Sequence, residues 1–318
     1  MRARSVLVAV FLFALAGAAK AAPLRVCLDF FPNPNHVPLY VALEALGGSL
    51  DVEIIVPGDP SDPVKLAASR AVDVCLTPQM NYLIARSEGL PLVAVGALID
   101  HGLGGLLALA GGSIESLSDL VGRRIGYSLE PLEPVLWRTM LQCAGVDPDA
   151  VEFYPIGYST VASLLAGSVD AIGAFRNFEP IEVDLVGRPG VFFPQEAYCI
   201  PETYELLFAV HPNVAAERPD DLRAFLAAVA GAVAATRADP GAAFAAFLRA
   251  NPDLDDELDR RSFAATLPLY AEGARHDDGT VWDALQSFLF EHGITAAIGS
   301  MESLYRTDFL PLLEEGET

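Results

Sequence analysis

Short apolar runs alternate with helical segments along most of the chain, and this alternation constrains the fold more than any other feature. In the first third of the chain the apolar runs are "LRVCLD", "DVEIIV", "VDVCLT" and "LVAVGALI". Helical patterns at residues 36–46, 63–69 and 79–87 separate them. Strands that alternate with helices are typical of parallel βα units. The first series therefore predicts a mostly parallel sheet flanked by helices.

A second series of the same kind begins at residue 124. Its apolar runs are "RIGYS", "VEFYPIG" and "DAIGAF", and the helical patterns cover residues 132–143, 160–166 and a stretch from about residue 178. Two further strands, "LLALA" and "ELLFAV", flank this series, and we interpret them as crossings between two lobes. Only helical patterns follow, among them residues 219–237, 240–248 and 281–292.

The chain is also longer than one hydrophobic core usually supports. We predict two α/β lobes joined by two crossover strands, with residues 22–108 and 209–318 in lobe 1 and residues 109–208 in lobe 2. Ligands in open α/β sheets bind beyond the carboxyl ends of the strands. Two such lobes therefore predict a hinged cleft at their strand ends.

Residues 1–21 have the pattern of a secretory signal peptide. Two arginines precede an apolar run from Val6 to Ala16, and the triplet Ala19-Lys20-Ala21 resembles an A-x-A cleavage site. The run is shorter than the roughly 20 residues that a membrane span needs. We expect a periplasmic protein without stable membrane insertion, cleaved near Ala22.

The chain is strongly acidic. Three of the 20 basic residues lie before Ala22, so 17 basic residues face 42 acidic ones, a formal charge of −25 after cleavage. Such a surface repels nucleic acid and anionic lipid. We therefore expect no nucleic-acid partner.

Four cysteines are spread along the chain without C-x-x-C spacing, so no zinc site is predicted. Cys27 and Cys75 lie in apolar strand patterns and Cys143 lies in a helical pattern, whereas Cys199 stands alone. Export would permit a disulfide, but we expect buried free thiols.

Several predicted strands end in groups that could bind a ligand. The first ends in "DFFPNPNH", which contains Phe30, Asn33, Asn35 and His36. Turn formation and helix capping explain this segment equally well. The third strand leads into Gln79, which alone is compatible with a helix start. In the second series, "RIGYS" presents Tyr127.

The segment "DAIGAFRNFEP" is the most informative strand end. It places Phe175, Asn177, Phe178 and Glu179 directly after an apolar strand. The two rings could belong to a core and Asn177 could cap a helix, but a buried carboxylate is costly unless it has a partner. "PETYELL" adds Tyr204 at the return crossing. Together these residues predict a pocket for a flat, polar, nitrogen-rich molecule.

The segments "LDFFPNPNHVPLYVAL", "IGYSLEPLEPVLWRTML", "VDAIGAFRNFEPIEVDL" and "IPETYELLFAV" occur in an order that resembles the thiamine-pyrimidine binding proteins of the NMT1/THI5-like superfamily. These are periplasmic components of ABC transporters that collect hydroxymethylpyrimidine or formylaminopyrimidine. The resemblance implies a type II-like periplasmic-binding-protein fold and a membrane permease as partner. It also implies a binding protein with no cofactor, rather than an enzyme.

The resemblance also implies how the ligand is held. A flat aminopyrimidine would stack between Phe30 on one lobe and Phe178 or Tyr204 on the other. Glu179 would accept a hydrogen bond from the exocyclic amine or share a proton with a ring nitrogen. The edge of lobe 1 that contains Asn33, Asn35 and His36 would complete the site, and closure of the lobes would create the surface that a permease recognises.

Two alternatives stay open at this point. The same superfamily contains a hydroxymethylpyrimidine synthase that consumes pyridoxal phosphate and an active-site histidine. Its cofactor lysine aligns with Thr77 and its cysteine-rich motif with the single Cys199, whereas His36 fits both activities. The second alternative is a binder of the same fold for a sulfonate, a flavin or another aromatic molecule, although a sulfonate would not favour Glu179.

Overall fold

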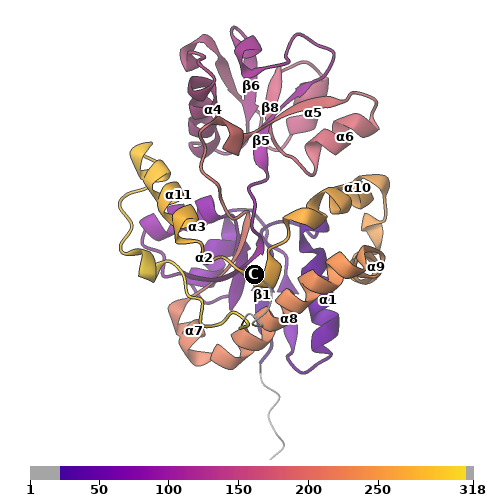
Figure 1. Cartoon of the computed structure of the whole chain (residues 1–318), viewed down its shortest axis with the longest axis vertical. Helices are drawn as coiled ribbons and strands as arrows, with labels where there is room; N and C mark the ends of the chain where they lie inside the picture. The colour runs from indigo at the N-terminus through magenta and orange to yellow at the C-terminus, as the bar shows by residue number, and fades with distance from the viewer. Residues whose placement is uncertain (1–21, 313–318) are drawn as a thin grey trace, which may run out of the picture.

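The computed structural model describes residues 22–312, which form two lobes stacked along the long axis of the molecule (Figure 1). Each lobe contains a five-stranded sheet flanked by helices, ordered β2-β1-β3-β10-β4 in lobe 1 and β7-β6-β8-β5-β9 in lobe 2. In each sheet four strands point the same way, and only β10 or β5 runs antiparallel to its neighbours. The predicted fold class is confirmed.

The first lobe is built from the first βα series together with one late strand. Its strands are β1 (Leu24–Cys27), β2 (Val52–Ile55), β3 (Val74–Thr77), β4 (Val93–Ile99) and β10 (Leu206–Val210). Its early helices are α1 (Val37–Leu46), α2 (Asp62–Ala68) and α3 (Gln79–Ser87). Every residue of β3, β4 and β10 is buried, which explains their continuous apolar runs.

The second lobe contains the second series. Its strands are β5 (Gly104–Leu109), β6 (Arg124–Tyr127), β7 (Glu152–Pro155), β8 (Ala171–Phe175) and β9 (Gly190–Pro194). Its helices are α4 (Leu132–Cys143), α5 (Thr160–Leu165) and α6 (Glu179–Leu185), and a short 3₁₀ helix, η4 (Gln195–Tyr198), follows β9.

The C-terminal helices pack on lobe 1 (Figure 1). They are α7 (Pro212–Glu217), α8 (Pro219–Ala238), α9 (Pro240–Ala250), α10 (Glu257–Thr266) and α11 (Gly279–Glu291). Helix α8 lies against α1, and buried Phe225 and Val229 of α8 belong to the same apolar cluster as Leu39 of α1. The apolar stripe of α8 is therefore the face of the helix that packs onto lobe 1 and covers its sheet.

The chain crosses between the lobes twice, at residues 100–103 and 199–205, which we call the first and second crossings. Each crossing precedes the antiparallel strand of the sheet that it enters, β5 or β10. The segments predicted as crossings, "LLALA" and "ELLFAV", instead pair within a single sheet. The actual crossings lie a few residues earlier, because both segments are apolar enough to be buried as strands.

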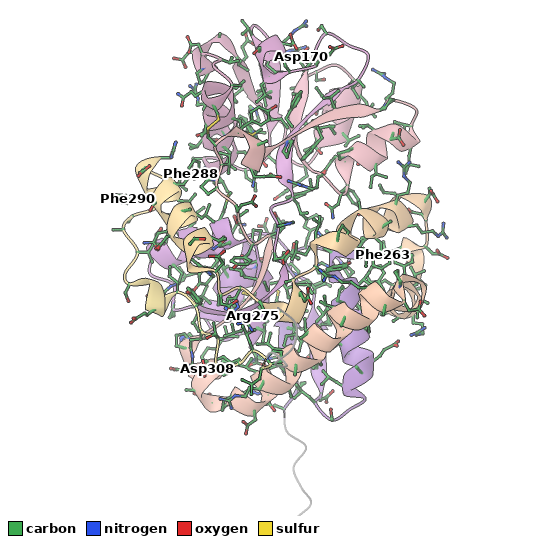
Figure 2. The ribbon with its side chains drawn as sticks, in the orientation of Figure 1. Asp170, Phe263, Arg275, Phe288, Phe290 and Asp308 are labelled. Carbon is green, nitrogen blue, oxygen red and sulfur yellow. A yellow bond between two sulfur atoms is a disulfide. The ribbon has the colours of Figure 1, made fainter. Side chains whose placement is uncertain are left out.

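Two of the four cysteines form a disulfide, so the expectation of free thiols is wrong for Cys143 and Cys199 (Figure 2). Cys143 ends α4 and Cys199 follows η4, and their Cα atoms are 5.9 Å apart although 56 residues separate them in sequence. Tertiary packing of α4 against η4 brings them together, and local sequence patterns do not reveal such contacts. Cys27 and Cys75 are buried free thiols as expected.

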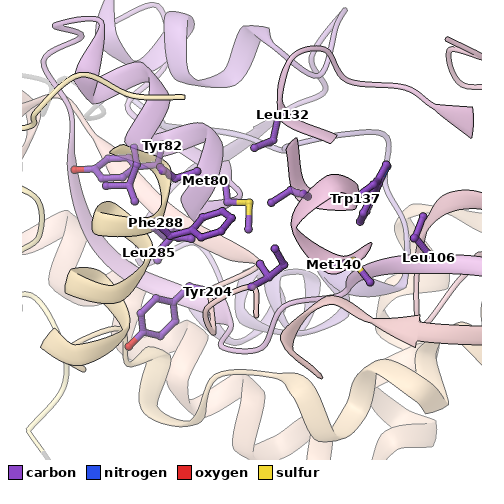
Figure 3. Packing of buried hydrophobic residues seen from close by; sticks show 14 of the residues in the cluster. Met80, Tyr82, Leu106, Leu132, Trp137, Met140, Tyr204, Leu285 and Phe288 are labelled. Carbon is purple, nitrogen blue, oxygen red and sulfur yellow. The ribbon is translucent and has the colours of Figure 1, made fainter. Parts of the chain in front are cut away.

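One apolar cluster extends through both lobes (Figure 3). Lobe 1 contributes Met80 from α3 and Leu285 and Phe288 from α11, whereas lobe 2 contributes Leu132 and Trp137 from α4. All five side chains are buried. The lobes are therefore joined by side-chain packing on the α4–α11 side as well as by the two crossings.

Candidate functional site

The carboxyl ends of β1 and β8 meet at the junction of the lobes. Asn177, two residues after β8, donates from Nδ2 to Oδ1 of Asn35 at 2.8 Å and to Oγ1 of Thr266 at 2.7 Å. Asn35 follows β1 and Thr266 ends α10, so both acceptors belong to lobe 1. Nearby, Arg261 of α10 pairs with Asp184 of α6 at 2.7 Å. Two strand ends predicted to bind a ligand therefore contact each other directly.

The segment after β1 is held by a compact set of hydrogen bonds. Oδ1 of Asn33 accepts from the backbone N–H of Asn35 at 2.9 Å, and the Asn33 N–H donates to Nδ1 of His36 at 3.2 Å. The other ring nitrogen, Nε2, lies 2.7 Å from Oδ1 of Asp29. Because Nδ1 accepts, Nε2 carries the proton and donates to Asp29. Asn33 and buried His36 therefore fix the loop, as the capping interpretation of "NPNH" predicts.

Glu179 begins α6, and its carboxylate folds back onto the end of β8. Oε2 accepts from the Phe175 N–H at 2.7 Å. The pKa of Glu179 is raised to about 7, mainly by burial and also by the nearby Glu182 and Glu133 carboxyls, and the Phe175 N–H opposes the change. Near neutral pH the carboxyl can therefore accept a hydrogen bond or hold a proton.

Glu205, which was not among the predicted site residues, is a buried carboxyl that connects the two crossings. It is 8% exposed, and its Oε2 accepts from the N–H of Leu103 at 3.0 Å, so it links the second crossing to the first. Burial raises the pKa of Glu205 to about 7; the Leu103 N–H and the Arg176 guanidinium oppose this, and Asp29 adds to it. The sequence feature that could have pointed to Glu205 is a glutamate directly before the apolar run "LLFAV".

Gln79 and Tyr204 are connected where the second crossing enters lobe 1. Oε1 of Gln79 accepts from the Tyr204 N–H at 3.0 Å and from Oγ1 of Thr203 at 3.2 Å. Among the described residues, Nε2 of this fully buried side chain has no partner. The Tyr204 ring is buried 6.0 Å from Trp282, and its hydroxyl accepts from the Asp278 N–H at 3.1 Å. These contacts place the Tyr204 ring in the core of lobe 1, not beside Glu179.

Exposed rings gather at the strand ends of both lobes. Phe30 after β1 is 41% exposed and Phe175 at the end of β8 is 46% exposed. Phe31 and Tyr158 are exposed as well, although neither was among the predicted site residues. The pKa of the Tyr158 hydroxyl is raised by burial and then by Asp59 of lobe 1, so this loop of lobe 2 faces the other lobe. Phe178 and Tyr127 are half-buried.

Within residues 22–312 there is no group of three or more His, Cys, Asp or Glu side chains arranged to hold a metal ion. No helix in the same range is long and apolar enough to cross a membrane. The site consists of carboxyls, amides and rings, which suits reversible binding of a flat polar molecule.

Comparison with known proteins places the chain in a family. The profile described as "NMT1/THI5 like" matches residues 33–243. The chain belongs to the NMT1/THI5-like family. A Haemophilus influenzae protein named for thiamine biosynthesis is 35% identical to it over 276 residues, which is 85% of this chain and 87% of that protein.

Two further relatives represent the two activities considered above. The formylaminopyrimidine-binding protein of Halalkalibacterium halodurans is 34% identical over 206 residues, covering 64% of this chain and 62% of that protein. A 4-amino-5-hydroxymethyl-2-methylpyrimidine phosphate synthase of Legionella pneumophila is 26% identical over 296 residues, covering 89% of this chain and 91% of that protein.

Solved structures support the fold. The periplasmic aliphatic sulphonate binding protein of Escherichia coli superposes with a TM-score of 0.72 and 14% identity, over 93% of this chain and 94% of that one. At this identity the similarity establishes the periplasmic-binding-protein fold and nothing about the ligand.

Proposed function

We propose that this chain is the exported substrate-binding component of an ABC importer and captures a thiamine pyrimidine precursor, hydroxymethylpyrimidine or formylaminomethylpyrimidine. The observation that carries this proposal is the position of Glu179, a carboxyl with a pKa raised to about 7, among exposed rings where the strand ends of two lobes meet. The 34% identity to a formylaminopyrimidine-binding protein supports the same ligand class.

The rings, the carboxyl and the amides of the site would contribute to binding in different ways. A flat ring would stack on Phe30 from lobe 1 and on Phe175 or Phe178 from lobe 2, and each aromatic pair adds about 0.5–1.5 kcal/mol beyond area burial. Glu179 would accept from the exocyclic amine, a charged hydrogen bond worth about 1.5–3 kcal/mol. Asn35 and Gln79 would contribute to the polar edge on lobe 1. The carboxylate then sets specificity, and the rings provide much of the affinity.

Export has independent support from the Cys143–Cys199 disulfide. Disulfides persist in oxidising compartments such as the periplasm and are rare in the cytosol. The predicted signal peptide, residues 1–21, lies outside the described residues. Delivery to a permease would follow from closure of the two lobes about residues 100–103 and 199–205.

The synthase is the second candidate, because the Legionella relative carries that name. At the end of β3 this chain has Thr77, a buried side chain whose hydroxyl lies 3.3 Å from the Pro78 carbonyl. A threonine cannot form a Schiff base with pyridoxal phosphate. The observation at residue 77 therefore favours binding over synthesis.

Isothermal titration calorimetry and thermal unfolding with the two pyrimidines would test the proposal. At a ligand concentration one hundred times Kd, the stabilisation should be about 2.7 kcal/mol. An alkanesulfonate and pyridoxal phosphate serve as controls, and neither should stabilise the protein. A clear shift with the sulfonate and none with either pyrimidine would refute the ligand, and formation of a pyridoxal phosphate adduct would favour the synthase.

Glu179→Gln and Phe178→Leu test the assigned roles. Glu179→Gln keeps the volume but presents an NH₂ group toward a donor amine, which costs about 1–3 kcal/mol, or roughly tenfold to a hundredfold in affinity. Phe178→Leu should weaken binding less, since apolar volume remains. If Glu179→Gln bound like the parent, the carboxylate would merely cap the end of β8.

A further inference from the structure

A second carboxyl, that of Glu133, lies beside the end of β8. Glu133 is in the first turn of α4, and its Oε2 accepts from the Ser128 N–H at 2.6 Å and the Leu129 N–H at 3.4 Å. The carboxyl lies against Gly173 of β8: a Cβ at residue 173 would be 3.4 Å from Oε1 of Glu133, an ordinary contact, and would clash with the Trp137 ring at 2.8 Å. Gly173 is two residues before Phe175, whose N–H binds Glu179. Glu133 and Glu179 thus approach the same strand end from different helices.

Neither carboxyl has a positive partner among residues 22–312. Both accept only backbone N–H groups. On the elements around them, Arg176 pairs with Glu196 and Arg261 pairs with Asp184, so these guanidinium groups are engaged elsewhere. The other titratable groups that face the pair are Glu182 and Tyr158, which supply no positive charge.

A third acceptor lies on the same turn as Glu179. Nδ2 of Asn177 donates to Asn35 and Thr266, which uses both of its hydrogens and fixes the orientation of the amide. The remaining atom, Oδ1, is buried without a partner among the described residues, and the whole side chain is only 2% exposed. A buried acceptor of this kind normally has a donor. The end of β8 therefore offers acceptors without a matching side-chain donor.

We infer that Glu133 is a second specificity-determining carboxyl, and that the pair Glu133–Glu179 selects ligands whose binding edge consists of N–H donors and carries no negative charge. Such an edge resembles an amidine. It is formed by an amino group and a neighbouring ring nitrogen, where that nitrogen is protonated or receives a proton from one of the two carboxyls. A 4-oxo group in the same place would present a hydrogen-bond acceptor to two carboxyls that are themselves acceptors. This inference rests on the proposed function and assigns the feature of the pyrimidine that this side of the site reads.

The electrostatics of the free protein agree with this assignment. Burial raises the pKa of Glu133, and the Ser128 and Leu129 N–H groups oppose the change. The Glu133 carboxyl raises the cost of ionising Glu179. A ligand that brings N–H donors or a positive charge relieves this repulsion, whereas an anion increases it. The charge of the ligand thus lets this pair of carboxyls discriminate between aminopyrimidines and sulfonates.

Calorimetry with matched ligands and variants tests the inference. The ligands are 4-amino-5-hydroxymethyl-2-methylpyrimidine, its 4-oxo analogue and benzamidine as a simple amidine probe. The parent should bind the amino compound at least a hundredfold more tightly than the oxo compound. Glu133→Gln should lose tenfold or more of the affinity for the amino compound, whereas Glu182→Gln, which removes the same charge from α6, should lose less than threefold.

The outcomes separate this inference from the proposed function. Parent-like affinity in folded Glu133→Gln, or an oxo compound bound as tightly as the amino compound, overturns the inference and leaves pyrimidine binding intact. Binding of benzamidine without either pyrimidine, lost in Glu133→Gln, refutes the proposed ligand and supports the charge selection. Binding of no amino compound and no amidine overturns both. Unfolding midpoints and Glu133→Asp, which restores the charge, show whether any loss comes from misfolding.

Discussion

Replacing Glu205 by glutamine should make the stability of this protein less sensitive to pH. Glu205 is buried between the crossings, and burial raises its pKa from an ordinary 4.5 to about 7. Between these two values the folded protein holds a proton that the unfolded chain has released. The free energy of unfolding contributed by this group therefore falls as pH rises from about 4.5 to about 7, and is constant above that.

The structure also sets the size of the effect. The difference between 4.5 and about 7 corresponds to about 3 kcal/mol between acidic and alkaline conditions. Glutamine is nearly isosteric, and its carbonyl oxygen can still accept the Leu103 N–H that Glu205 accepts at 3.0 Å. Glu205→Gln should therefore match the parent near pH 4.5 and exceed its free energy of unfolding by up to about 3 kcal/mol at pH 8.

Urea unfolding followed by circular dichroism at pH 5, 6, 7 and 8 measures this difference. Other buried acids such as Glu179 contribute equally to parent and variant, so subtraction isolates Glu205. Glu202→Gln, an exposed glutamate on the same crossing, is the control and should stay within about 0.5 kcal/mol of the parent at every pH. A parent–variant difference that does not grow with pH would refute the reasoning.

Three further predictions concern the contacts that hold the lobes. Phe288→Ala should lower the free energy of unfolding by about 3 kcal/mol, while Phe290→Ala on the exposed side of α11 should change it by under about 0.5; equal urea midpoints would contradict the role of the apolar cluster (Figure 2). Replacing Cys143 and Cys199 together by serine should cost about 4 kcal/mol in the same assay, given the 56-residue separation, and no loss would mean that the thiols are not joined. Asn177→Ala removes two hydrogen bonds between the lobes, so small-angle scattering should show a larger radius of gyration without ligand; an unchanged radius would mean that other contacts fix the closure.

The sheets were predictable because the patterns that form them are local. An apolar run followed by a helical period specifies a βα unit wherever it occurs, and the helix predicted at 79–87 is α3 (Gln79–Ser87). The strand β9 (Gly190–Pro194) was not predicted, since "GVFFP" is short and bounded by glycine and proline, which normally mark turns. It forms an edge strand beside β5, where proline is tolerated.

The candidate site was predictable in part, because residue types at strand ends can be recognised but their partners cannot. Asn177 was predicted as a ligand-binding residue from "GAFRNFE", yet nothing in the sequence indicates that Asn35 and Thr266 would receive its two hydrogen bonds. Tyr204 has the chemistry of a stacking ring, but the second crossing turns it toward Trp282. Tertiary contacts of this kind override the local signal.

Glu179 and Glu205 show why a raised pKa does not by itself identify a ligand-binding group. Burial raises the pKa of both carboxyls to about 7. Glu205 has Arg176 nearby to favour its ionised form and bonds the backbone of the other crossing, so its surroundings account for it as a structural link. Within the part of the chain that the structure describes, the charged neighbours of Glu179 are two further carboxyls, Glu182 and Glu133. Within residues 22–312 Glu179 receives one backbone N–H and no positive charge, and a bound aminopyrimidine would supply further donors. This difference separates the proposed binding carboxyl from the structural one.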